Sequence, residues 1–335
     1  MNRGVILLAL CAALHMACGS HTESALDAGV GVLMDAEPNM GWRTIASVGN
    51  GPIQEIGVTA LNDKLYIVGG FDETLQIGSS VQVYDPEQDR WSNAAPLPVV
   101  VHHANLAAVD GKLYVVGAMQ LEGFSFTAIG HTYQYDPTQN QWFRKSDMPA
   151  GTERGASAVG VIAGKIIVAG GLRDGAVSDV SSYDPATDTW DDSLPNLPAA
   201  TDHLVGASVG ENFYAIGGRS GGIEDLREQV LVYNSSRGNW QEAAPMLTPR
   251  GGAAAGVLEG KVIVVGGEGD INRPSGVFSE VESYDPLADA WTSLEPMLTP
   301  RHGMAAAAIG DSLYVPGGAT KQGFGAVATA EAFRP

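Results

Sequence analysis

The sequence predicts an all-β protein in which one four-stranded module recurs many times. Six tryptophans with the same local pattern stand 48 to 51 residues apart: Trp42, Trp91, Trp142, Trp190, Trp240 and Trp291. A period near 50 residues is typical of stacked or circular repeats. Glycine is abundant, with 43 residues, which suits many tight turns. Because the repeat fills most of the 335 residues, we expect a single closed domain.

The first half of each module predicts two buried strands. A segment of small residues such as 252–258 (GAAAGVL) comes first and fits the crowded centre of a ring. A β-branched run such as 261–267 (KVIVVGG) follows, which indicates a second buried strand. The glycine pair that ends this run suits a place where backbones converge or turn with positive φ.

The second half of each module predicts two further strands around a tight turn. Residues 81–84 (VQVY) alternate in polarity, as a strand with one buried face should. Asp85-Pro86 then starts a turn, because proline restricts φ and aspartate bonds to nearby backbone N–H groups. Trp91 lies in the last strand, seven residues after Tyr84, and this spacing recurs in five copies.

This order of small-residue strand, Gly-Gly, Tyr-Asp-Pro and tryptophan resembles that of kelch repeats over residues 41–335. The resemblance implies a six-bladed β-propeller of four-stranded kelch blades. Trp42 has no module before it, and residues 331–335 (EAFRP) stop where a tryptophan should follow. We therefore predict that residues 41–47 supply the outer strand of the last blade. This exchange closes the ring and hides both free sheet edges.

The first 18 residues predict a secretory signal peptide. An apolar run (4–14) follows Arg3, and residues 16–20 (MACGS) resemble a bacterial lipobox with Cys18 as the lipid-bearing residue. His15 stands where that motif prefers leucine, so cleavage nearby without lipidation stays open. Residues 19–40 lack periodicity and predict a flexible tether. We expect an outer-membrane or periplasmic lipoprotein, alternatively a secreted protein, whose membrane contact is limited to a lipid on Cys18.

Charge and cysteine content limit the classes of partner and cofactor. The net charge of −19 repels nucleic acid and favours cationic partners or simple solubility. The two cysteines, Cys11 and Cys18, both precede the repeats, which therefore contain no disulfide and no thiolate ligand. No cofactor-binding motif is present, so we expect no cofactor and no metal, and we expect a monomer.

Two sets of residues are candidates for ligand binding. Loop length varies most between the second and third strands of each module, and function usually lies on such loops; the candidates there are Arg173, Arg219 and Asp225. Aligning the six copies places a second set near the mouth of the central channel: His102, His103, Arg154, Asp202, His203, Arg250, Arg301 and His302. These groups could bind an anion or a metal, or the arginines could tie neighbouring blades together. No local spacing of histidines matches a metal motif.

The leading functional interpretation is a non-catalytic module that recognises protein or carbohydrate through the loops of one propeller face. We assign no catalytic residue. The alternative is a sugar-converting enzyme that resembles N-acetylneuraminate epimerase, another kelch propeller, with Glu55, Asp202 and His203 as sources of an acid and a base. The chemistry of galactose oxidase, a copper-containing kelch propeller, is excluded because its cross-linked cysteine has no counterpart after Cys18.

Overall fold

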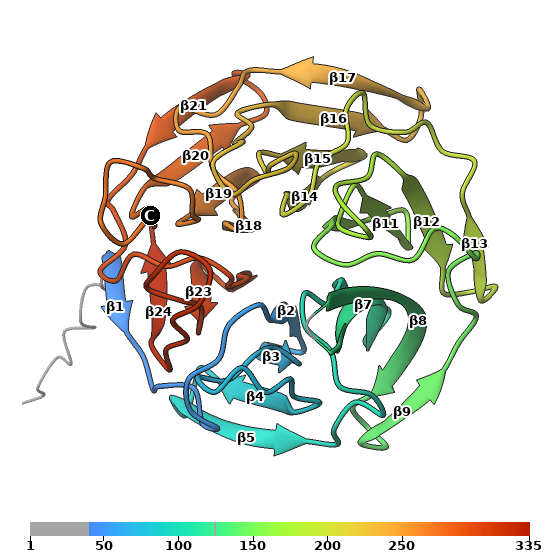
Figure 1. Ribbon diagram of the computed structural model, residues 1–335, viewed down its shortest axis with the longest axis horizontal. Coiled ribbons are helices and arrows are strands. Elements are labelled where there is room, and N and C mark those ends of the chain that lie inside the picture. Colours follow the sequence, from blue (N-terminus) through green and yellow to red (C-terminus); the bar gives the residue numbers. More distant parts are fainter. Residues whose placement is uncertain (1–39, 124) are drawn as a thin grey trace, which may run out of the picture. The chain divides into compact units, whose positions relative to one another are not determined.

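The computed structural model describes residues 40–123 and 125–335. These residues form six antiparallel four-stranded sheets around a central axis, which confirms the predicted six-bladed propeller (Figure 1). The predicted signal peptide, Cys18 and all of the predicted tether except Met40 lie outside the described residues. No helix long and apolar enough to cross a membrane occurs in the part of the chain that the structure describes.

Each blade follows the chain outward from the axis, from its first strand to its fourth. Blade 1 is β2 (Gly57–Leu61), β3 (Lys64–Val68), β4 (Val81–Asp85) and β5 (Arg90–Ala94); blade 2 is β6 (Leu106–Val109), β7 (Lys112–Glu122), β8 (Ser125–Asp136) and β9 (Gln141–Arg144). Blade 3 is β10 (Ala158–Ile162), β11 (Lys165–Ala169), β12 (Val180–Asp184) and β13 (Thr189–Asp191). Blade 4 is β14 (Val205–Val209), β15 (Asn212–Ile216), β16 (Val230–Asn234) and β17 (Asn239–Ala243). Blade 5 is β18 (Ala254–Leu258), β19 (Lys261–Val265), β20 (Val281–Asp285) and β21 (Ala290–Ser293).

Blade 6 contains both the first and the last strand of the propeller, as predicted. Strands β22 (Ala307–Ile309), β23 (Ser312–Pro316) and β24 (Ala330–Arg334) are completed by β1 (Gly41–Thr44). The register pairs Trp42 with Phe333, and their rings lie 5.0 Å apart. The N-terminal strand therefore covers the edge that β24 would otherwise expose.

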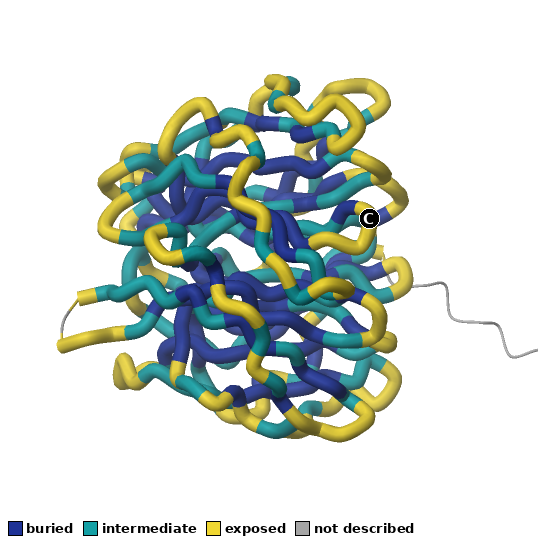
Figure 2. Tube along the Cα trace, turned by 90° about the vertical axis from the view of Figure 1, so that its right-hand side faces the viewer, coloured by how far each residue is buried: buried dark blue, intermediate teal, exposed yellow. Residues whose placement is uncertain are grey.

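The six tryptophans bind the blades to one another. The indole N–H of Trp91 donates to the carbonyl of Ala46, and that of Trp142 donates to Ala95, at 2.8 and 2.9 Å. Five of the rings also pack on the tyrosine seven residues earlier, as Trp91 does on Tyr84 at 5.1 Å, and Trp42 packs on Phe333 instead. All six tryptophans are thus packing residues. The buried residues of the propeller lie between its two faces (Figure 2).

The two faces of the propeller differ in their connections. The loops between second and third strands, and the loops that lead to the next blade, lie together on one side, which we call the loop face. Backbone hydrogen bonds such as Leu97 N–H to Ser79 C=O join the two kinds of loop. The opposite side, the turn face, carries the short turns between first and second and between third and fourth strands. On the loop face, the hairpin formed by the long strands β7 and β8 projects beyond the other loops, at the left of Figure 2.

Candidate functional site

A closed ring of backbone hydrogen bonds surrounds the propeller axis. It joins one residue from each blade, just before the first strand; we call these six residues the axial ring: Glu55, His103, Ala156, His203, Gly252 and Gly303. The N–H of each donates to the carbonyl of its counterpart in the preceding blade, at 2.5 to 3.1 Å. All six residues have positive φ, between 49° and 61°. This backbone favours glycine, so the three large side chains stand at positions where they are unusual.

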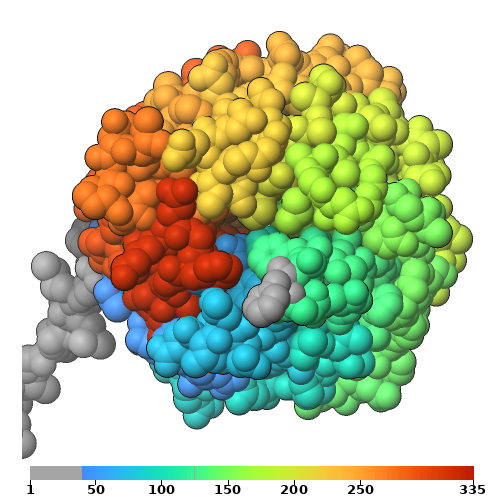
Figure 3. Space-filling view, viewed as in Figure 1, coloured from blue at the N-terminus to red at the C-terminus, as the bar shows by residue number. Residues whose placement is uncertain are grey.

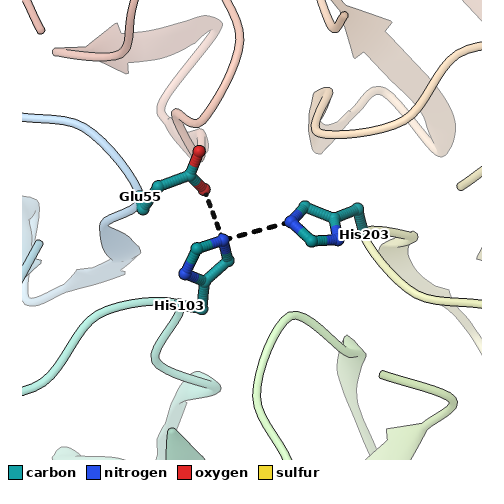
Figure 4. Close-up of side chains that lie close together, drawn as sticks. All are labelled: Glu55, His103 and His203. Atoms are coloured by element: carbon teal, nitrogen blue, oxygen red, sulfur yellow. Dashed lines mark hydrogen bonds and ion pairs between the residues drawn. The ribbon is translucent and has the colours of Figure 1, made fainter. Parts of the chain in front are cut away.

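The side chains of Glu55, His103 and His203 converge on the axis (Figure 4). Nε2 of His103 lies 2.9 Å from Oε2 of Glu55 and 3.1 Å from Nε2 of His203. The side chains are only 5% to 11% exposed. The three residues come from blades 1, 2 and 4, which explains why no short sequence motif contains them.

Neighbouring residues orient the two histidines. Nδ1 of His203 lies 2.5 Å from Oδ1 of Asp202, and Nδ1 of His103 lies 2.5 Å from Nδ1 of His102. Nη2 of Arg219 lies 3.0 Å from Nε2 of His203. Because arginine can only donate, Nε2 of His203 is the acceptor and its Nδ1 carries the proton donated to Asp202.

Two further charged residues complete the cluster. Arg219 forms ion pairs with Asp202 at 3.2 Å and with Glu268 at 2.6 Å. Nε2 of His302 donates to the carbonyl of Lys321. This leaves Nδ1 of His302 facing the carboxylates of Glu268 and Glu55, at 3.5 and 3.7 Å, without a hydrogen bond.

Burial and charge set the protonation of the cluster. Burial alone would raise the pKa of the Glu55 carboxyl, but His103, His302 and His203 together hold that pKa well below its usual range. Burial lowers the pKa of His102 to about 3, and the neighbouring His103 adds to this shift. Burial also lowers the pKa of His203, against the effect of the hydrogen bond that it donates to Asp202. Glu55 is therefore ionised, and His102 and His203 are neutral, at pH 7.

A channel leads along the axis away from the axial ring. Its volume is about 460 Å³, and in every blade its lining begins at the axial-ring residue. From there it follows small and aliphatic residues of the first strands toward the turn face. Thr59 and Val161, far from the ring, are partly exposed to it. The polar cluster thus forms the loop-face end of an apolar channel.

The three arginines that the sequence placed near the channel mouth do not line the channel. Arg154, Arg250 and Arg301 are at most 1% exposed. Arg250 and Arg301 pair with Glu282 and Glu331 of the third strand, at 2.9 and 3.1 Å. Their guanidinium groups also donate to backbone carbonyls of their own blades. We therefore interpret them as structural and leave them out of the candidate site.

Arg154 has the same position but a neutral environment. It donates to the carbonyls of Gly170 and Val168 and to the hydroxyl of Ser181, at 3.0, 2.9 and 3.2 Å. Burial lowers its pKa to about 10, against the attraction of Asp179, which leaves it protonated at neutral pH. Arg154 thus stabilises blade 3 from within.

The structure divides the remaining candidates between the cluster and the outer loops. It brings His102, His103, Asp202, His203, Arg219 and His302 together around the axis. Arg173 instead pairs with Asp179 at 2.9 Å, and the exposed Asp225 accepts a hydrogen bond from Ser220. These two residues belong to the loops of blades 3 and 4.

Glu268, which was not among the candidates, lies in the loop between β19 and β20, yet it is 2% exposed and belongs to the cluster. Isolated β-bridges next to the axial ring explain why Glu268 lies in the cluster. In each blade, the residue that follows the Gly-Gly site forms an isolated β-bridge with the residue just before the axial ring. The residues that follow the Gly-Gly sites are Phe71, Met119, Leu172, Arg219, Glu268 and Ala319. Four of these six residues are apolar, so the charged side chains of Arg219 and Glu268 differ from the repeat pattern in a way that the sequence alone reveals. Comparison of the copies at this single position would have found both residues.

An aromatic group covers the centre of the loop face. Phe71 lies 4.3 Å from the ring of His102, 5.9 Å from Phe126 and 6.1 Å from Phe324. A groove of about 290 Å³ lies beside it, between residues 72–75 of blade 1 and 324–326 of blade 6. In the space-filling view these two segments, blue and red, meet near the middle of the face (Figure 3).

Comparisons with known proteins agree with this architecture. The family model described as the KLHDC2/KLHL20/DRC7 Kelch-repeats domain matches residues 16–196 and 145–318. Kelch-like protein terF of Aspergillus terreus is 31% identical over 312 residues, which cover 88% of this chain and 68% of that protein. Kelch-like protein 36 of Bos taurus is 27% identical over 276 residues, which cover 80% of this chain and 44% of that protein.

The chain therefore spans about two thirds of the first relative and less than half of the second. Among solved structures, that of YjhT matches with a TM-score of 0.72 at 18% identity, covering 85% of this chain and 95% of the other. At this identity the match shows a common fold alone. The chain belongs to the kelch-repeat family.

Proposed function

We propose that this chain is a non-catalytic interaction module that binds a protein partner through its loop face. Family membership supports this proposal, because kelch-repeat propellers typically serve as protein-interaction modules. The observation that carries it is the one-sided distribution of exposed apolar side chains.

Large apolar residues are exposed mainly on loops of the loop face: Leu75, Val100, Leu121, Leu247, Ile271, Leu298 and Phe324. Among the described residues, the opposite face exposes two such side chains, Leu287 in a turn and Met40 just before β1. Exposed apolar side chains that gather on one surface are characteristic of interaction sites. The distribution therefore favours the loop face as the binding surface.

The groove between blades 1 and 6 is part of this surface. Leu75 and Phe324, which line it, are 44% and 50% exposed, and Asp72 and Glu73 give it negative charge. Phe324 is held by an edge-to-face contact with Phe71, so little side-chain freedom remains to be lost on binding. A partner that presents an apolar side chain next to a lysine or arginine fits this chemistry.

The test compares substitutions on the two faces. The chain without its leader is used to capture interacting proteins, which are then purified and titrated against three variants. We expect Phe324→Ser and Leu75→Ser each to weaken binding of a loop-face partner at least tenfold, as loss of an interface anchor does. Leu287→Ser removes a leucine of the turn face that is 99% exposed, more than either groove residue, and should leave the affinity unchanged.

A partner whose affinity is insensitive to Phe324→Ser and Leu75→Ser would contradict the proposal. Binding of the same chain to a glycan array, lost in the same two variants, would instead indicate a carbohydrate ligand on this groove.

We further propose that the module works at the cell envelope, as an outer-membrane or periplasmic lipoprotein or alternatively as a secreted protein. Support comes from the lipobox-like residues around Cys18. Metabolic labelling with a radioactive fatty acid should mark the full chain and not its Cys18→Ser variant. Equal labelling of both would exclude Cys18 as the anchor.

The second candidate function is sugar conversion at the end of the axial channel. One observation favours it: ionised Glu55 and neutral His203 line the same cavity, and either could act as a base that takes a proton from a sugar and then returns it as the conjugate acid. Conversion of anomeric sugars can be followed by NMR. Rates that stay unchanged in Asp202→Asn and His203→Gln variants would exclude this function.

A further inference from the structure

The axial ring contains a set of donor atoms that the binding function of the loop face does not use. We propose that Glu55, His103 and His203 bind a divalent transition-metal ion on the propeller axis. This site lies below the loop face and is independent of the partner proposed for that face.

The donor atoms already approach the geometry that a metal requires. A metal about 2.1 Å from each ligand atom separates neighbouring ligand atoms by about 3.0 to 3.4 Å. Nε2 of His103 lies 2.9 Å from Oε2 of Glu55 and 3.1 Å from Nε2 of His203. One ligand atom from each residue lies within 4.8 Å of both others, so rotation of the Glu55 carboxylate can complete the set.

The backbone gives an independent reason to expect a ligand. Ala156, Gly252 and Gly303 form the same hydrogen-bonded ring without a large side chain. The hydrogen-bonded ring therefore does not require the side chains of Glu55, His103 and His203. These residues also have the unfavourable energy of a left-handed backbone. Strained positions of this kind persist where the side chain has a function. Their three counterparts are small, and at Gly303 the missing side chain makes room for Glu55, because a Cβ there would lie 2.5 Å from Oε1 of Glu55.

The contacts around the two histidines are those of metal ligands. A metal-binding histidine usually donates its second ring nitrogen to a carboxylate or another acceptor, which fixes the ring. Nδ1 of His203 donates to Asp202, and Nδ1 of His103 meets Nδ1 of His102. Both Nε2 atoms consequently point to the axis.

The charge of the cluster also favours a cation. Three carboxylates, those of Glu55, Asp202 and Glu268, surround one guanidinium group, that of Arg219. The carboxylates outnumber the guanidinium group in a mostly buried site, and negative charges there are unfavourable without compensation. A divalent cation balances them. Nδ1 of His302, which lacks a hydrogen bond, faces two of these carboxylates.

The donor types select the class of metal. Two imidazoles and one carboxylate suit Zn²⁺, Co²⁺ or Fe²⁺, whereas Ca²⁺ and Mg²⁺ prefer sites made of oxygen atoms. Nη2 of Arg219 now contacts Nε2 of His203, and the metal takes over that contact. Arg219 then keeps its ion pairs with Asp202 and Glu268. The axial channel provides the route by which a small ligand reaches the open positions.

The experiment uses the chain from residue 19 onward, freed of metal with a chelator and titrated with Co²⁺ and Zn²⁺. We expect one equivalent to bind, with a Co²⁺ absorption spectrum typical of nitrogen and oxygen ligands, and no competition from excess Mg²⁺ or Ca²⁺. His103→Gly and His203→Gly each remove one ligand but introduce the residue that Gly252 and Gly303 already use in the ring. Each should weaken binding at least a hundredfold.

Two further variants sharpen the result. Asp202→Asn, which acts through His203, should weaken binding about 10- to 100-fold. His131→Gln removes an imidazole outside the cluster and serves as the matched control, with unchanged affinity. Absence of saturable binding to the parent chain, or equal affinity of the parent and both glycine variants, would overturn the proposal.

Should the glycine variants fail to fold, X-ray absorption of the Zn²⁺-loaded parent decides. Two imidazole ligands are expected, and a spectrum without imidazole would exclude the site.

Discussion

Blades 3, 5 and 6 differ from blades 1, 2 and 4 at two positions that lie two residues apart. In the first group a buried arginine, Arg154, Arg250 or Arg301, is followed at the axial ring by alanine or glycine. In the second group an uncharged residue, Ile53, Val101 or Thr201, is followed by Glu55, His103 or His203.

This difference separates stability from function within one repeated fold. The arginine side chain turns into its blade and bonds to the second and third strands. The axial-ring residue lies two positions after the arginine position. Its backbone is left-handed, which directs its side chain to the centre. Three blades thus contribute internal ties, and the other three contribute the side chains of the proposed metal site. Three predictions test this division, from the largest expected effect to the smallest.

Arg301→Ala should cause the largest loss of stability. It leaves the carboxylate of Glu331, which is 1% exposed, buried without its partner. Loss of one member of a buried ion pair costs about 3–5 kcal/mol. Urea unfolding followed by tryptophan fluorescence measures this change. The control is Arg173→Ala, which breaks a partly exposed pair and should shift stability by less than about 1 kcal/mol. Equal effects of the two substitutions would contradict a structural role for Arg301.

Gly303→Ala should have an intermediate effect, and Gly310→Ala provides its matched control. The two glycines have φ of 60° and 59°, so alanine meets the same backbone cost at both, about 1–2 kcal/mol. A Cβ at residue 303 would lie 2.5 Å from Oε1 of Glu55, whereas one at residue 310 meets no atom within 4 Å. We expect Gly303→Ala to cost about 1 kcal/mol more, measured by thermal unfolding.

Displacement of Glu55 should also be visible at the axis. Gly303→Ala should weaken binding of Co²⁺ or Zn²⁺, while Gly310→Ala should not. The same stability for both variants would show that the space left by Gly303 is not needed for Glu55.

Ser181→Ala should have the smallest effect of the three. It removes one of the acceptors of Arg154, the hydroxyl at 3.2 Å from Nη2, and leaves the backbone carbonyls in place. One hydrogen bond to a charged group contributes about 1.5–3 kcal/mol, and the remaining acceptors reduce the loss to about 1 kcal/mol. Differential scanning calorimetry measures the change. A loss as large as that of Arg301→Ala would mean that Arg154 depends on Ser181 as Arg301 depends on Glu331.

Much of the fold could be predicted from residues because each strand is specified locally. Tyr84 and Trp91, seven residues apart, meet across one antiparallel pair, and Gly69 and Gly70 have the positive φ expected of them. The unpaired Trp42 and residues 331–335 predicted the strand exchange that closes the ring. The loop-rich face was predicted from the variation in loop length between the copies.

The sequence by itself thus determined the repeat, the number of blades and the closure, because short-range patterning and tight turns specify strands without reference to distant residues. Only the tertiary structure decided which candidate side chains meet. It turned the three arginines into their blades, added Glu268 to the cluster and placed His103 next to His203, 100 residues later. The physical reason is that a closed ring brings equivalent positions of separate blades to one axis, whereas the direction of each side chain depends on the local backbone conformation.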